Sequence, residues 1–224
     1  MDYRGKNSWL KAPEKGQLGK AQWAALNQAF KPSGGAFDKC DMVILVSTLP
    51  LVMYSSGWTR FVEKFVDDAQ EEWEFKHVDE HTKLLALMDD WKVAKKGSRE
   101  LFVVGGDVHH CGHTDIYRDG RRAFSQLVTS GICQELPKEV VMIFSKIMMG
   151  TSNKIDDEWT FSHHDWVKRN NYGLVSVNNS PIKKGRDFTV QLVTSVPKSK
   201  IKLERMIIYS HRKMDEKSAC CTIF

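Results

Sequence analysis

Two short apolar segments constrain the fold of this chain more than any other feature. They are "MVILVSTLP" at 42–50, a predicted buried strand that Pro50 ends, and "LFVV", which begins a strand predicted at 101–108. A strand whose residues are all apolar must be covered on both faces. Apolar residues at helical spacing predict helices at 18–30, 57–75 and 79–97. Buried strands separated by helices predict an α/β layered domain.

Further strands are predicted towards the C-terminus. The segments are "HTDIY", "RAFSQLVTSGIC", "YGLVSVN", "DFTVQLVTS" and "IKLERMIIYS", and a helix is predicted at 137–149, where Pro137 suits the first turn. The segment "FSHHDW" at 161–166 is interpreted as a surface hairpin.

Composition excludes several classes of protein. The 224 residues carry a mild net charge of +5, and their Lys and Arg residues are dispersed, so no nucleic-acid partner is expected. The five cysteines form no CxxC pair, which favours reduced thiols in the cytosol. The N-terminus has no apolar signal region, and the longest apolar run is too short for a membrane span. A cytoplasmic protein is therefore expected.

The segment "GGDVHHCGH" at 105–113 follows the second apolar strand and concentrates metal-ligating residues. If the strand stays extended, Asp107 and His109 lie two residues apart and project from the same face. A carboxylate beside an imidazole is a partial ligand set for a divalent ion such as manganese, iron or zinc. Asp107 and His109 are therefore the predicted metal ligands.

Other histidines have less specific surroundings. His110 would point away from the predicted pair. His113 could return towards it as a further ligand, a phosphate contact or a proton donor. The segment "FSHHDW" contributes His163, His164 and Asp165 as a second dense candidate. An exposed turn is the favoured interpretation of His110, and an exposed hairpin is that of His163, His164 and Asp165.

Several motifs occur in an order that resembles the PhoD-like branch of the metallophosphoesterase family. They cover residues 2–132 and continue more loosely through "HDWVKRNNYGLVSV". In order, they are "DYR", "LGKAQWAAL", "MVILVSTLPLV", "LLALMDDW", "ELFVVGGDVHH" and "RAFSQLVTSGI". Of these, "GGDVHH" is the most specific.

The resemblance implies a sandwich of mixed sheets flanked by helices, with residues 1–212 forming the C-terminal portion of a phosphatase domain. It implies hydrolysis of phosphate mono- or diesters by divalent metal ions. Asp107 and His109 would then be metal ligands, and Arg4 would bind phosphate. His113 would be the catalytic residue that stabilises charge on a phosphoryl oxygen or protonates the leaving group.

The ligand set of a two-metal phosphatase is incomplete in this sequence. Such a site holds two cations about 3.5–4 Å apart, and in the family further ligands precede the D-x-R motif. No second Gly-Asp pair occurs in the chain. Three hypotheses remain open: the C-terminal half of a larger phosphoesterase, an inactive binding or regulatory module on the same scaffold, and an unrelated structural zinc domain.

The sequence ends in Cys221-Thr-Ile-Phe, which fits a C-a-a-X prenylation motif, and the adjacent Cys220 could accept a palmitoyl group. Residues 213–224 are predicted to form a flexible tail. Two lipids anchor a protein stably whereas one does so marginally, so this motif predicts attachment to the cytosolic face of a membrane.

Overall fold

The structure is a computed structural model, and it confirms the α/β class. It describes residues 18–53, 78–95, 99–108, 111–130, 153–167, 170–179, 186–194, 204–208 and 221–223. The helices predicted at 57–75 and 137–149 lie outside the described residues.

The two described helices match the predicted periodic segments. They are α1 (Gly19–Ala29) and α4 (Val78–Ala94). The strands are β1 (Met42–Val46), β2 (Glu100–Gly105), β3 (Cys111–Arg118), β4 (Arg121–Thr129), β5 (Asn153–Lys154), β6 (Trp159–Val167), β7 (Asn171–Asn179), β8 (Arg186–Thr194), β9 (Glu204–Ile208) and β10 (Cys221–Ile223). No described helix is both long and apolar enough to cross a membrane.

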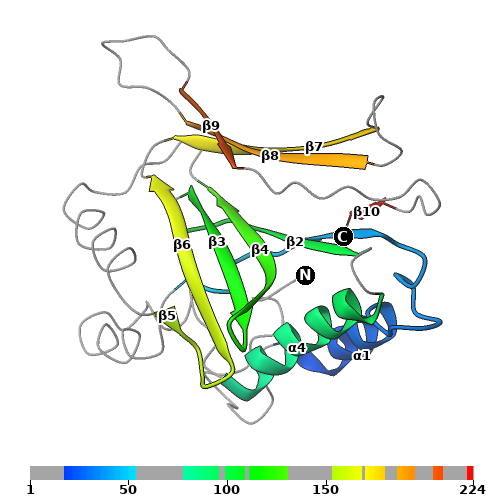
Figure 1. Ribbon diagram of the computed structural model, residues 1–224. Helices are drawn as coiled ribbons and strands as arrows, with labels where there is room; N and C mark the ends of the chain where they lie inside the picture. The colour runs from blue at the N-terminus through cyan, green and yellow to red at the C-terminus, as the bar shows by residue number, and fades with distance from the viewer. Residues whose placement is uncertain are drawn as a thin grey trace.

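The described strands form two sheets (Figure 1). The larger sheet is mixed and has the order β10-β1-β2-β4-β3-β6-β5. Its first four strands, β10, β1, β2 and β4, run parallel to one another, whereas β3 is antiparallel to both β4 and β6. The smaller sheet, β7-β8-β9, is antiparallel. The antiparallel neighbours β3 and β6 bring residues about fifty positions apart in the chain to adjacent places.

The apolar segments are explained by burial on both faces of the larger sheet. Val43 and Leu45 of β1 pack in the cluster that also contains residues of α1 and α4. Met42 and Ile44, at the alternate positions, pack with Leu192 of β8. The helices therefore cover one face of the larger sheet and the smaller sheet covers the other, as Figure 1 shows.

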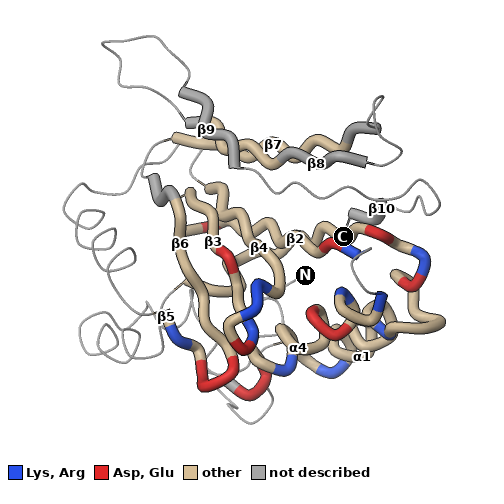
Figure 2. The backbone as a smooth tube through the Cα atoms, viewed as in Figure 1, with Lys and Arg blue, Asp and Glu red and all other residues tan. Residues whose placement is uncertain are grey.

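Charged residues hold the β3–β4 hairpin against α4. Acidic and basic residues gather at that end of the sheet in Figure 2. Arg118 Nη1 lies 2.8 Å from Asp90 Oδ1, and its Nε donates to Glu158. Arg121 Nη2 donates to Asp89 Oδ2 at 2.6 Å, and Asp89 is fully buried. These ion pairs connect the β3–β4 hairpin to α4 and to Glu158.

One sequence-based prediction is wrong. "FSHHDW" is not a surface hairpin but the middle of β6, which pairs with β3 over seven positions. Residues 221–223 form β10, which pairs in parallel with β1. Residues 213–220 and 224 lie outside the described part of the chain, so the flexible tail over 213–224 stays a prediction.

Candidate metal site

The backbone after β2 differs from the extended strand that was predicted to 108. The strand ends at Gly105, where an added Cβ would lie 3.0 Å from the Pro50 backbone. Asp107 has a φ of 71°, and the Val108 N–H donates to the Gly106 carbonyl oxygen at 3.0 Å. This is a tight three-residue turn. Asp107 therefore does not continue the extended strand, contrary to the sequence-based prediction.

Of the predicted metal ligands and phosphate contact, the structure describes only Asp107. Asp107 is exposed at the turn, and His109, its predicted co-ligand, lies outside the described residues. Arg4 also lies outside them. The metal pair Asp107–His109 and the phosphate contact of Arg4 therefore remain predictions.

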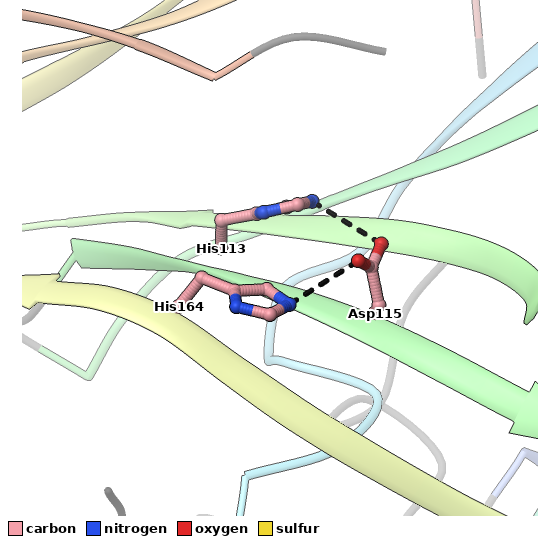
Figure 3. Close-up of side chains that lie close together, drawn as sticks. All are labelled: His113, Asp115 and His164. Atoms are coloured by element: carbon pink, nitrogen blue, oxygen red, sulfur yellow. Dashed lines mark hydrogen bonds and ion pairs between the residues drawn. The ribbon is translucent and has the colours of Figure 1, made fainter.

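Residues from β3 and β6 form a different cluster of potential ligands. His113 and Asp115 are two apart on β3 and share a face of the sheet, and His164 on β6 is the register partner of His113. The register shifts between Cys111 and His113, next to this cluster. We refer to His113, Asp115 and His164 as the triad; Figure 3 shows both imidazoles directed at the carboxylate.

The spacing of the triad suits a small metal ion. His113 Nε2 lies 3.5 Å from Asp115 Oδ1, and His164 Nε2 lies 3.2 Å from Asp115 Oδ2. Ligand atoms bonded at about 2.0–2.2 Å in tetrahedral geometry are roughly 3.3–3.5 Å apart. One potential ligand atom from each of the three side chains lies within 4.8 Å of the others. The two distances, which run to different oxygens of the Asp115 carboxylate, are close to this range.

The three side chains of the triad differ in solvent exposure. The side chains of His113, Asp115 and His164 are 9%, 15% and 42% exposed. Two ligands are thus held rigidly, whereas His164 borders solvent and can adjust. This arrangement allows an ion to enter from the His164 side and leaves coordination positions for water or a ligand.

Neighbouring polar groups orient the carboxylate. Asp115 Oδ1 accepts hydrogen bonds from Ser125 Oγ at 2.6 Å and from Arg122 Nε at 2.8 Å. Burial alone would raise the pKa of Asp115, but the Ser125 hydrogen bond and the charges of Arg122 and the two histidines lower it below its ordinary value. Asp115 is therefore ionised at neutral pH, as a ligand must be.

His163, the neighbour of His164, faces the opposite side of the sheet. Its Nδ1 lies 2.8 Å from Thr114 Oγ1 and its Nε2 lies 2.9 Å from the Met53 carbonyl oxygen. Burial and, to a smaller extent, the nearby His164 lower the pKa of His163 to about 4, although the hydrogen bond to Met53 opposes the shift. His163 is thus a structural residue behind the triad, and the side chain of Asp165 is not described.

The structure changes the interpretation of His113. Of the three roles expected for His113, the geometry favours that of a further ligand, since its Nε2 faces a carboxylate within a potential ligand set. The segment "HTD" puts a histidine and an aspartate at i and i+2 of a predicted strand, which is a signal for this pair. His164 could not be assigned to the site without the register of β6.

The structure does not test the predicted lipidation. Cys220 lies outside the described residues, and Cys221 is described only as part of β10. Its backbone is the register partner of Met42. Modification of either cysteine remains a prediction.

Comparison with known proteins gives little support for a family assignment. No family model matches the chain, and no curated protein matches it. Among solved structures, "Structure of PhoD" is similar at 10% sequence identity over 96% of this chain, with a TM-score of 0.39. The chain spans 39% of the length of that protein's chain. A likeness this weak establishes neither a family nor an activity, so functional inference depends on the triad.

Proposed function

We propose that the chain binds one divalent transition-metal ion through His113, Asp115 and His164, and that this site handles phosphate esters. The convergence of two imidazole nitrogens on one ionised carboxylate, at 3.5 and 3.2 Å, carries the first part. Two histidines and one carboxylate are a common ligand set for catalytic zinc and for non-haem iron. Ordered motifs in the sequence, "GGDVHH" above all, motivate the second part.

Each residue of the triad would have a separate role in binding the ion. Asp115 supplies the negative charge that offsets the ion, while Ser125 and Arg122 hold its other lone pairs in place. His113 is buried and would bind the ion from inside the protein. His164 is more exposed, so solvent or a ligand could reach the ion from its side. A divalent ion at this position would polarise a phosphoryl oxygen and make bound water more acidic.

One ion with three protein ligands is less than a two-cation phosphoesterase requires. We therefore expect the 224-residue chain alone to bind metal but to hydrolyse phosphodiesters slowly or not at all. A binding or regulatory module that holds a phosphate ester without turnover is the alternative function, and it predicts the same metal affinity with no turnover.

Metal binding and turnover can be measured on the same variants. Zn²⁺, Mn²⁺ and Co²⁺ are titrated into the wild type, Asp115→Asn and the control Asp119→Asn by calorimetry. Asp119 is an exposed residue of the β3–β4 turn with a φ of 48°, which asparagine tolerates. We expect Asp115→Asn to lose metal affinity at least about tenfold, and the control to keep it.

Hydrolysis of bis(p-nitrophenyl) phosphate is then followed with each metal. Turnover that disappears in Asp115→Asn supports an enzyme, and metal binding without turnover supports the binding module. Equal metal affinity in the wild type and Asp115→Asn would exclude the triad as the site.

A further inference from the structure

Arg122 lies directly beside the triad with part of its guanidinium group unused. It is on β4 opposite Tyr117, where a register shift follows Ile116. Its Nε donates to Asp115 Oδ1 at 2.8 Å and its Nη2 contacts Ser125 Oγ. Nη1 has no hydrogen-bond partner among the described residues, and the side chain is 43% exposed. A permanently charged donor therefore faces solvent next to the triad.

We propose that Arg122 and the metal ion held by the triad together form an oxyanion subsite that binds a phosphate group. This inference rests on the proposed function and names the side chain that would contact the phosphate group. The guanidinium fork matches the tetrahedral oxygens of phosphate, and hydrogen bonds between ionised partners are the strong ones. Arg122 would be a specificity-determining residue that contacts the ligand.

The charges favour an anion over a neutral ligand. A divalent ion and Arg122 contribute three positive charges, whereas Asp115 contributes one negative charge. The histidines bind metal as neutral groups. Two positive charges therefore remain beside a site that borders solvent, and a dianion such as inorganic phosphate or a phosphate monoester balances them. A neutral carbonyl or amide ligand would leave them uncompensated.

The neighbouring arginine is a matched control. Arg121 precedes Arg122 on β4 and is also partly exposed, but its Nη2 donates to the buried Asp89 at 2.6 Å. Its ion pair joins α4 and not the triad. Replacing either arginine with glutamine removes one positive charge from the same strand. In Arg121→Gln the buried Asp89 keeps Arg118 as a partner, with Nη1 3.5 Å from Asp89 Oδ2.

The test uses the full chain loaded with one equivalent of Zn²⁺ or Mn²⁺ and titrated with inorganic phosphate by calorimetry. Arg122→Gln should bind phosphate at least about tenfold more weakly than the wild type. Arg122→Lys should be intermediate because it keeps the charge but loses the fork. Arg121→Gln should bind phosphate as the wild type does, and thermal unfolding confirms that each variant is folded.

The outcomes separate this inference from the proposed function. If the metal binds but Arg122→Gln and the wild type bind phosphate equally, or if Arg121→Gln weakens binding as much, the oxyanion subsite is wrong and the metal site stands. If the wild type binds no metal, the proposed function and this subsite both fail. Loss of metal affinity in Arg122→Gln, with phosphate affinity of the loaded protein unchanged, would make Arg122 a positioning residue for Asp115 and overturn the subsite.

Discussion

Mild acid should destabilise the fold through the buried ring of His163. This side chain is 6% exposed, and its Nε2 must donate to the Met53 carbonyl oxygen because a carbonyl can only accept. In the neutral ring Nδ1 then accepts from the Thr114 hydroxyl at 2.8 Å. Burial lowers the pKa of His163 to about 4, from an ordinary value of 6.5. Protonation would place a charge in the core.

The sign and size of the effect follow from proton linkage. Between pH 6.5 and 4 the unfolded chain binds a proton on this residue and the folded chain does not, so stability falls as pH falls. Each unit of pKa difference corresponds to about 1.4 kcal/mol. At pH 5 the loss from His163 is therefore about 2 kcal/mol, and at pH 4 it is about 3 kcal/mol. Burial also lowers the pKa of His81, to about 3, which adds a loss of the same sign.

A variant without the titrating ring isolates this contribution. The free energy of unfolding is measured by urea titration at pH 7, 6 and 5 for the wild type and His163→Gln. The wild type should be the more stable at pH 7, and its advantage should shrink by about 2 kcal/mol at pH 5. His81 is present in both proteins, so its contribution cancels. An advantage that stays constant from pH 7 to 5 would refute the reasoning.

Two further predictions concern β1 and its neighbours. Gly105→Ala would put a Cβ 3.0 Å from backbone atoms of Pro50, so we expect a destabilisation of about 1–3 kcal/mol by urea unfolding. Gly106→Ala meets only the Thr129 carbonyl oxygen at 3.3 Å and should cost less; equal costs would contradict the packing. Prenylation of Cys221 would show in mass spectra of the protein from its own cells as a lipid-modified C-terminus. An unmodified terminus that keeps Thr-Ile-Phe would exclude the anchor.

Local patterns were sufficient to predict much of the fold. The helical spacing of apolar residues placed α1 and α4 correctly, and the apolar run of β1 correctly indicated a strand buried on both faces. The strand predicted to extend to 108 ends at Gly105 instead. The turn that ends it requires a positive φ at Asp107, which is uncommon outside glycine.

The site could be predicted only in part. In β6 the buried positions Trp159, Phe161 and His163 alternate with polar residues, which is a strand pattern, but the adjacent His164 makes the segment resemble a polar turn. The proximity of Asp115 and His164 depends on the register between strands that lie 49 residues apart. Local sequence does not determine such a register, so the triad could not be assembled without the structure.

The ligands of a bound ion can be identified by X-ray absorption at the zinc edge, on protein loaded with one equivalent of Zn²⁺. The triad predicts an inner shell of nitrogen and oxygen at about 2.0–2.1 Å, with imidazole scattering from two histidines. That scattering should diminish in His164→Ala, whose replaced side chain lies 42% exposed. Scattering from sulfur at about 2.3 Å, or a two-histidine shell that His164→Ala leaves intact, would contradict the site.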